Sequence, residues 1–119
     1  MKVTVRITRS FRKSAKRLLK KYPSLHQELS ELNDDLSANP RQGKTLGHNI
    51  YKIRLAVKSK GKGKSGGLRV ISYVEVEIIG SIEKDNSVTF VNLIYIYDKS
   101  ETATITDKEI QEIISGIQE

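Results

Sequence analysis

Residues 51–71 read YKIRLAVKSKGKGKSGGLRVI, which predicts two strands joined by a loop rich in glycine and lysine. In the first strand, at residues 50–57, apolar side chains alternate with Lys52 and Arg54. Strand residues two apart point to the same face, so these two cations lie together, about 6.6 Å apart along the strand. The glycines interrupt the alternation, and a second strand that carries Arg69 follows them.

Positive charge is concentrated in the first part of the chain. Between Asp35 and Glu75 there are nine Lys or Arg residues and no carboxylate. Residues 1–74 contain eighteen Lys or Arg against four Asp or Glu, a net of +14, whereas residues 75–119 contain three against ten, a net of −7. The strong excess of positive charge in residues 1–74 indicates a polyanionic partner. We expect nucleic acid rather than an anionic membrane, because no basic amphipathic helix stands apart from the fold.

Length and composition exclude several classes of protein. The 119 residues correspond to one domain, residues 1–119. The absence of cysteine excludes disulfides and thiolate metal sites, and His26 and His48 lack the spacing of a zinc pair. We therefore expect neither a metal nor a cofactor. No apolar run resembles a signal peptide or a membrane span, so we expect a cytoplasmic protein with no membrane partner.

Helical periodicity predicts two helices in the first third of the chain. A strand at residues 2–7 precedes a helix capped by Thr8 or Ser10, and the far face of this helix is basic. The second helix has Pro23 in its first turn and stops at Asn39-Pro40. Helices joined so closely are expected to form an antiparallel hairpin. Their apolar stripes are Phe11, Ala15, Leu18 and Tyr22, and Leu25, Leu29, Leu32 and Leu36.

The second half of the chain is predicted to complete a sheet. The strand at residues 68–76 is expected to run on toward Ile82, with a turn near residues 84–86. Residues 88–97 are almost all apolar, which predicts a central strand buried on both faces. The capping box TDKE at residues 106–109 begins a last helix with isoleucines at helical spacing. This order predicts an α+β fold, with the helical hairpin on one face of a small, mostly antiparallel, twisted sheet.

Three segments together resemble the RelE/ParE toxin superfamily, most closely its HigB-type members. They are the basic helical hairpin, residues 51–71 and the apolar strand that ends in LIYIYDKSE. Toxins of the RelE kind are ribosome-dependent endoribonucleases that cut mRNA in the A site, and a cognate antitoxin encoded beside them inhibits them. The resemblance implies a RelE-like fold and a type II toxin that inhibits translation. It also implies the ribosome, mRNA and an antitoxin as partners, with a toxin–antitoxin hetero-oligomer.

The resemblance implies catalytic roles for four cations: Lys52, Arg54, Arg69 and Lys99. In metal-independent RNA cleavage the 2′-hydroxyl attacks the adjacent phosphate, which requires a base, an acid and cations. Lys52 can be the base if the two arginines lower its pKa by like-charge repulsion. The arginines suit the phosphorane, because their charge is permanent and their donors are forked.

The proton donor is left open by the sequence. Many RelE members carry an arginine and a tyrosine shortly beyond the last strand, where this chain has Ser100 and a threonine near Thr106. Tyr97 or Asp98 can substitute, or the reaction is organised differently. His48 precedes a predicted strand, and we interpret it as a loop residue rather than a proton-transfer group.

A further set of cations is predicted to bind RNA or the ribosome rather than to act in chemistry. The glycines of the loop allow its backbone to approach RNA closely, and its lysines can contact phosphates. The GKS sequence at residues 63–65 is not a nucleotide-binding P-loop, because a strand follows where that motif needs a helix. These cations are Lys58, Lys60, Lys62 and Lys64 in the loop, and Arg12 and Lys16 on the first helix.

Two other functions compete with the nuclease. One is a ParE-like inhibitor of DNA gyrase without nuclease activity, and the other is an RNA-binding module without catalysis. Gyrase-directed members generally lack the basic set, so Lys52, Arg54 and Arg69 together favour the nuclease. In the simplest alternative, these cations form an ordinary solvated strand face and the loop is a flexible, solvated hairpin.

Overall fold

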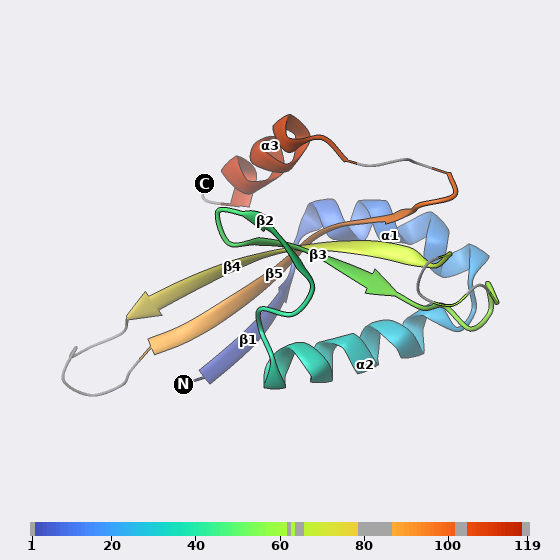
Figure 1. Cartoon of the computed structure of the whole chain (residues 1–119), viewed down its shortest axis with the longest axis horizontal. Helices are drawn as coiled ribbons and strands as arrows, with labels where there is room; N and C mark the ends of the chain where they lie inside the picture. The colour runs from blue at the N-terminus through green and yellow to red at the C-terminus, as the bar shows by residue number, and fades with distance from the viewer. Residues whose placement is uncertain (1, 62, 64–65, 79–86, 102–104, 118–119) are drawn as a thin grey trace.

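In the part of the chain that the computed structural model describes, a five-stranded mixed sheet and three helices form the fold (Figure 1). The described residues are 2–61, 63, 66–78, 87–101 and 105–117. The elements are β1 (Lys2–Ile7), α1 (Arg9–Lys21), α2 (Leu25–Ala38), β2 (Lys44–Gly47), β3 (Ile50–Leu55), β4 (Leu68–Ile78), β5 (Ser87–Asp98) and α3 (Asp107–Ile117).

The strand order in the sheet is β1-β5-β4-β3-β2. Strand β1 is parallel to β5, and the other pairings are antiparallel. The α+β class is therefore confirmed. The arrangement is compatible with a small RelE-like fold, although the sheet is mixed. The predicted turn near residues 84–86 and the continuation of β4 through residues 79–82 lie outside the described residues.

The sequence prediction omits one strand, β2. Its four residues are all exposed and show no apolar alternation, which removes the usual signal for a strand. The connection to β3 is a two-residue turn in which His48 and Asn49 have φ values of 52° and 64°. Two successive residues with positive φ are typical of a type I′ hairpin turn, whose twist matches that of the flanking strands. The signal for this hairpin is therefore the sequence GHNI.

The helical hairpin begins and ends close to the predicted positions. Of the two candidate caps, Thr8 is the one used, and its Oγ1 accepts a hydrogen bond of 3.1 Å from the backbone N–H of Phe11. The prediction that Pro23 lies in the first turn of α2 is wrong. The N–H of Leu25 bonds back to the carbonyl of Tyr22, at 3.0 Å, so Pro23 and the next residue form a turn before the helix.

Helices cover both faces of the sheet, as Figure 1 shows for α2 and α3. One core lies between the helical hairpin and one face, and a second core lies between α3 and the opposite face. The predicted capping box starts α3, because Thr106 and Glu109 exchange hydrogen bonds of 3.2 Å between side chain and backbone N–H. Within the described part of the chain, no helix is long and apolar enough to cross a membrane.

A bulge in β5 decides which residues of that strand face α3. Ile71 of β4 pairs with Tyr95, but the next residue of β4 pairs with Leu93, so Ile94 is an extra residue. The extra residue reverses the alternation of every side chain that follows it. As a result, Tyr97 faces the same side as α3, and Asp98 faces the helical hairpin.

Candidate active site

Two rows of side chains cross the sheet on the face that α3 partly covers. In the first row, Arg54 of β3 pairs with Arg69 of β4, and Arg69 pairs with Tyr97 of β5. In the second row, Lys44 of β2 lies opposite Lys52 of β3. Directly opposed like charges destabilise a sheet unless an anion binds between them. These rows therefore bring together cations from separate parts of the sequence.

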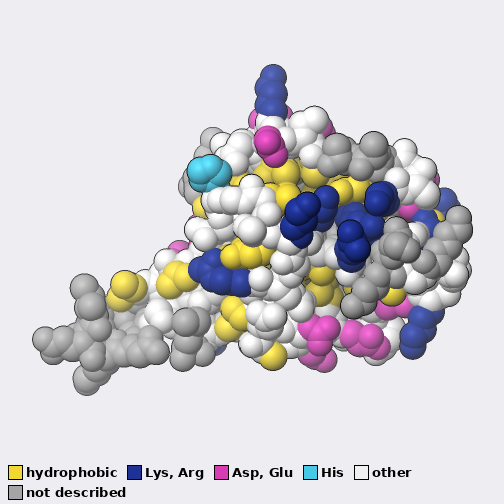
Figure 2. Space-filling model, in the orientation of Figure 1, with side chains coloured by type: hydrophobic (Ala, Val, Ile, Leu, Met, Phe, Trp, Pro, Cys, Tyr) yellow, Lys and Arg dark blue, Asp and Glu magenta, His cyan; other side chains and the backbone are white. Residues whose placement is uncertain are grey.

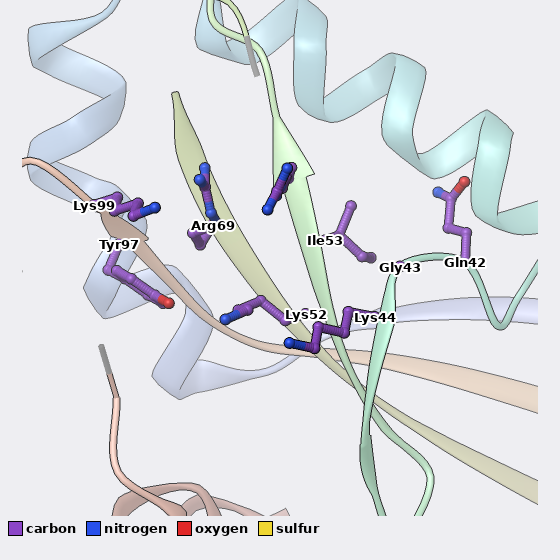
Figure 3. Close-up of a pocket in the computed structure, with 9 residues that line it drawn as sticks. Gln42, Gly43, Lys44, Lys52, Ile53, Arg69, Tyr97 and Lys99 are labelled. Atoms are coloured by element: carbon purple, nitrogen blue, oxygen red, sulfur yellow. The ribbon is translucent and has the colours of Figure 1, made fainter. Parts of the chain in front are cut away.

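The two rows enclose a pocket of about 390 Å³, which we call the cation pocket. Figure 3 shows the Lys52 ammonium and the Tyr97 hydroxyl pointing toward one another, whereas the Arg69 side chain points away from this pair and the Lys99 ammonium lies on the Arg69 side of the pocket. Among the described residues that line it, none is acidic. In the space-filling view, Lys and Arg side chains gather over this part of the sheet (Figure 2). The lining residues are Gln42, Gly43, Lys44, Lys52, Ile53, Arg54, Arg69, Tyr97 and Lys99.

The pKa of Lys52 is lowered from its ordinary value. Burial is the largest cause, because it disfavours the charged ammonium, and repulsion from neighbouring cations adds to it. Those neighbours are Lys44, Arg69, Lys99 and Arg54, in decreasing order of effect. A larger fraction of Lys52 is consequently neutral near pH 7 and able to accept a proton. Arg54 and Arg69 were predicted from the sequence to lower this pKa, whereas the effect of Lys44 was not predicted.

Arg69 is the most deeply buried cation of the pocket, with only 3% of its surface exposed. One of its nitrogens donates a hydrogen bond of 3.2 Å to the backbone carbonyl of Leu68. A guanidinium stays charged when buried, whereas a buried lysine readily loses its proton. Arg69 therefore supplies a permanent positive charge at the floor of the pocket, and Lys52 supplies a charge that can titrate.

Gly43 allows the chain segment before β2 to approach β3 closely. A Cβ atom at this position would lie 2.7 Å from the carbonyl oxygen of Lys52 and 2.9 Å from Cγ1 of Ile53. The residue also has a φ of +102°, which favours glycine. No larger residue fits without moving β3, so Gly43 sets how closely Lys44 approaches Lys52.

Asp98 lies on the opposite face of the sheet and belongs to a buried cluster. Its carboxylate accepts hydrogen bonds from Lys60 at 2.5 Å, from the Ser100 hydroxyl at 2.6 Å and from the Tyr22 hydroxyl at 2.7 Å. Burial alone would raise the pKa of Asp98, but these donors outweigh it and hold the pKa far below its usual range. Asp98 is thus ionised and cannot donate a proton, which removes one of the two candidates for the acid.

The predicted phosphate-binding lysines of the loop have different environments. Only 7% of the Lys60 side chain is exposed, and its ammonium is engaged by Asp98 within the protein. The Lys58 side chain is exposed, while its backbone N–H donates to Glu28 Oε2 at 2.7 Å and so ties the loop to α2. Lys62 and Lys64 lie outside the described residues.

The other predicted residues are not brought to the cation pocket. Arg12 and Lys16 are exposed on α1, where they line an apolar groove against α2. His48 lies in the β2–β3 turn and lines a separate pocket beside α3. In the described part of the chain, no three His, Cys, Asp or Glu side chains are grouped to hold a metal ion.

Comparison of the chain with protein-family models, with curated proteins and with solved structures found no match. The function is therefore inferred from the residues of the cation pocket and from their geometry.

Proposed function

We propose that this chain is the toxin of a type II toxin–antitoxin system and acts as a ribosome-dependent mRNA endonuclease. The observation that carries the proposal is the cation pocket, which among the described residues is lined by a tyrosine and by five lysines and arginines from three strands and the segment after β5. Such a site suits a phosphate that gains negative charge during a reaction, because preorganised donors bind the transition state more strongly than the substrate. The resemblance of the sequence to the RelE/ParE superfamily supports RNA as the polyanion.

The roles of the side chains follow from their positions. Neutral Lys52 takes the proton of the attacking 2′-hydroxyl, and the 2′-oxygen bonds to phosphorus. Arg54 and Arg69 stabilise the phosphorane, and Lys99 adds positive charge at the mouth of the pocket. The Tyr97 hydroxyl gives its proton to the leaving 5′-oxygen as the phosphorus–oxygen bond breaks. The products are a 2′,3′-cyclic phosphate and a 5′-hydroxyl, and return of a proton from Lys52 to Tyr97 restores both side chains, so the reaction balances without a cofactor.

Tyr97 is the better acid for two reasons. Asp98 is ionised and faces the other side of the sheet, whereas Tyr97 lines the cation pocket. The bulge at Ile94 places Tyr97 on the same face as Lys52. Partners in this proposal are the ribosome, mRNA and an inhibitory antitoxin encoded by an adjacent gene.

Expression of the chain without its antitoxin tests the proposal. We expect growth arrest with rapid loss of amino-acid incorporation in a pulse-labelling experiment, and mRNA fragments that end in 2′,3′-cyclic phosphate. DNA damage with translation intact would point instead to a gyrase inhibitor. Ribosome binding without fragments would point to the non-catalytic RNA-binding module.

A further inference from the structure

A second pocket lies beside the cation pocket, between α3 and the β2–β3 turn. Its volume is about 640 Å³, and we call it the α3 pocket. Strands β2, β3 and β4 and the β2–β3 turn form one wall, and α3 forms the other. Its lining residues are Leu46, His48, Ile50, Tyr73, Asp107, Ile110, Gln111, Ile114 and Ser115.

The chemistry of this pocket differs from that of its neighbour. None of the described residues that line it is a lysine or arginine, although the chain carries a net charge of +7. Leu46 is 38% exposed, which leaves apolar surface open to a ligand. Tyr73 adds an aromatic ring, and the Gln111 side chain supplies a neutral hydrogen-bonding group. The Ser115 hydroxyl donates to the carbonyl of Gln111 at 2.9 Å and is left as an acceptor. A flat, uncharged, hydrogen-bonding ligand such as a nucleobase fits this composition better than a phosphate does.

The two pockets share strands, and this sets the distance between them. Lys52 lines the cation pocket, and Ile50 lines the α3 pocket two residues earlier on the same strand. Two strand residues span about 7 Å. This separation is close to that between a phosphate and the base of its own nucleotide. One nucleotide can therefore place its phosphate among the cations and its base against α3.

The wall opposite α3 includes the type I′ turn between β2 and β3. His48 and Asn49 both have positive φ. The carbonyl of Asn49 accepts a hydrogen bond of 2.9 Å from the N–H of Val74, and its side-chain oxygen accepts one of 3.1 Å from Arg41. Positive φ at both positions belongs to the type I′ turn, and these two hydrogen bonds tie that turn to β4 and to the segment before β2. The His48 ring is thus presented from a tethered turn rather than from a loose loop.

We propose that the α3 pocket binds the base of the nucleotide whose phosphate lies in the cation pocket, and that it sets the base preference of cleavage. This inference rests on the nuclease function proposed above. It predicts a preference that originates in the protein itself, in addition to any that the ribosome imposes.

Nucleotide binding to the isolated full-length chain tests the inference without the ribosome. We would titrate the four 3′-nucleoside monophosphates and inorganic phosphate, following amide and side-chain shifts by NMR. Phosphate alone should shift only the resonances of the cation pocket. The nucleotides should also shift Leu46, His48 and Ser115, and the best base should bind roughly tenfold more tightly than inorganic phosphate, since stacking is worth about 5- to 150-fold per base.

Variants of α3 locate the base. Ser115→Trp fills the α3 pocket, and Lys108→Trp places the same side chain at an exposed position of α3 that does not line it. Ser115→Trp should remove the difference in affinity among the four nucleotides and leave the affinity for inorganic phosphate unchanged. Lys108→Trp should alter neither the difference in affinity nor the affinity for phosphate. Gln111→Ala provides a milder change and should reduce the difference among bases. Thermal unfolding shows whether each variant keeps α3 docked.

The outcomes separate this inference from the function on which it rests. If phosphate shifts the cation pocket but all four nucleotides bind equally and leave Leu46 and His48 unmoved, the base site is wrong and the nuclease proposal stands. If neither phosphate nor any nucleotide shifts the cation pocket, both are wrong. Sequencing of mRNA ends should likewise show a changed base at the cut site for Ser115→Trp and an unchanged one for Lys108→Trp.

Discussion

The cation pocket and the Lys60–Asp98 cluster lie on opposite faces of the sheet at the end of β5. They differ in the side chains that they place beside a positive charge. In the Lys60–Asp98 cluster a buried ammonium meets a buried carboxylate, and hydroxyls of Tyr22 and Ser100 complete the site. In the cation pocket, five cations share a space that no acidic residue lines among those described. Tyr97 and Asp98 are neighbours in the sequence, but Tyr97 lines the cation pocket and Asp98 belongs to the Lys60–Asp98 cluster.

The difference shows how to separate structural from functional charge in this chain. A buried pair with its hydrogen bonds satisfied holds segments together, because removing either partner leaves an uncompensated charge. Clustered cations repel one another and cost stability, so a pocket that gathers them suits the binding of an anion. Substitutions at both sites, taken from the largest expected effect to the smallest, test this division.

Asp98→Ala should have the largest effect, and it should act on stability. The change leaves the Lys60 ammonium buried without its partner, so we expect a loss of about 3–5 kcal/mol in the free energy of unfolding. Urea denaturation of the purified chain measures this loss. The double variant Lys60→Met with Asp98→Leu is the matched control and should recover most of it. A loss below about 1 kcal/mol would mean that the pair behaves like an exposed one.

The same ion pair predicts an acid dependence of stability. Because the folded-state pKa of Asp98 is lowered, its contribution is fully present above the ordinary aspartate pKa of about 3.9 and is lost as pH falls below it. Asp98→Asn should flatten this part of the stability–pH curve.

Arg69→Ala should act on the reaction instead. Loss of one preorganised donor typically costs about 10²–10³ in rate, so cleavage on the ribosome and toxicity in cells should both collapse. Antitoxin binding should persist. Arg69→Lys should rescue only part of the rate, because lysine keeps the charge but loses the forked donors. A folded Arg69→Ala protein that cleaves at the parent rate would remove Arg69 from the site.

Lys44→Met should shift the pH dependence of cleavage. Cleavage should rise with pH as Lys52 loses its proton, and removing the neighbouring charge raises the pKa of Lys52. The rising limb of the single-turnover profile should therefore move to higher pH. The rate near pH 7 should fall by less than about tenfold, since burial and three other cations still lower that pKa. A uniform loss at all pH values would instead assign Lys44 to binding.

Lys58→Gln should produce the smallest change, and it separates the two kinds of lysine in the loop. Each phosphate contact contributes roughly 0.7 to the slope of log affinity against log salt for single strands, so ribosome association should become slightly less salt-dependent. Lys60→Gln should leave that slope unchanged and lower stability, because its ammonium is engaged by Asp98. This assignment of the two lysines is wrong if Lys58→Gln lowers the stability and Lys60→Gln reduces the salt dependence of ribosome association.

Much of the fold could be predicted because the apolar residues of the first helix and of the central strand follow clear patterns. The stripe that begins at Phe11, the apolar strand at residues 88–97 and the capping box at Thr106 each appear in the structure as predicted. Strand β2 was not predicted because its residues are exposed and show no apolar alternation. The placement of Pro23 failed because the turn between the helices takes two residues before α2 starts.

The candidate site could be predicted only in part. Alternation along one strand placed Lys52 and Arg54 on a shared face, and the register with β4 adds Arg69 to them. Lys44 comes from the strand that has no sequence signal, so it was missed. Whether Tyr97 or Asp98 faces the cation pocket depends on one extra residue in β5. A bulge of this kind could not be predicted from the alternation of side chains along the strand.

The sequence by itself determined the local elements, the excess of positive charge and the residue types that can handle a phosphate. Those properties depend on neighbours along the chain, which the sequence shows directly. Tertiary structure alone decided which cations converge, which lysine is neutralised by a carboxylate and which tyrosine faces the pocket. These depend on strand pairing and register across long separations, where a shift of one residue turns every following side chain to the opposite face.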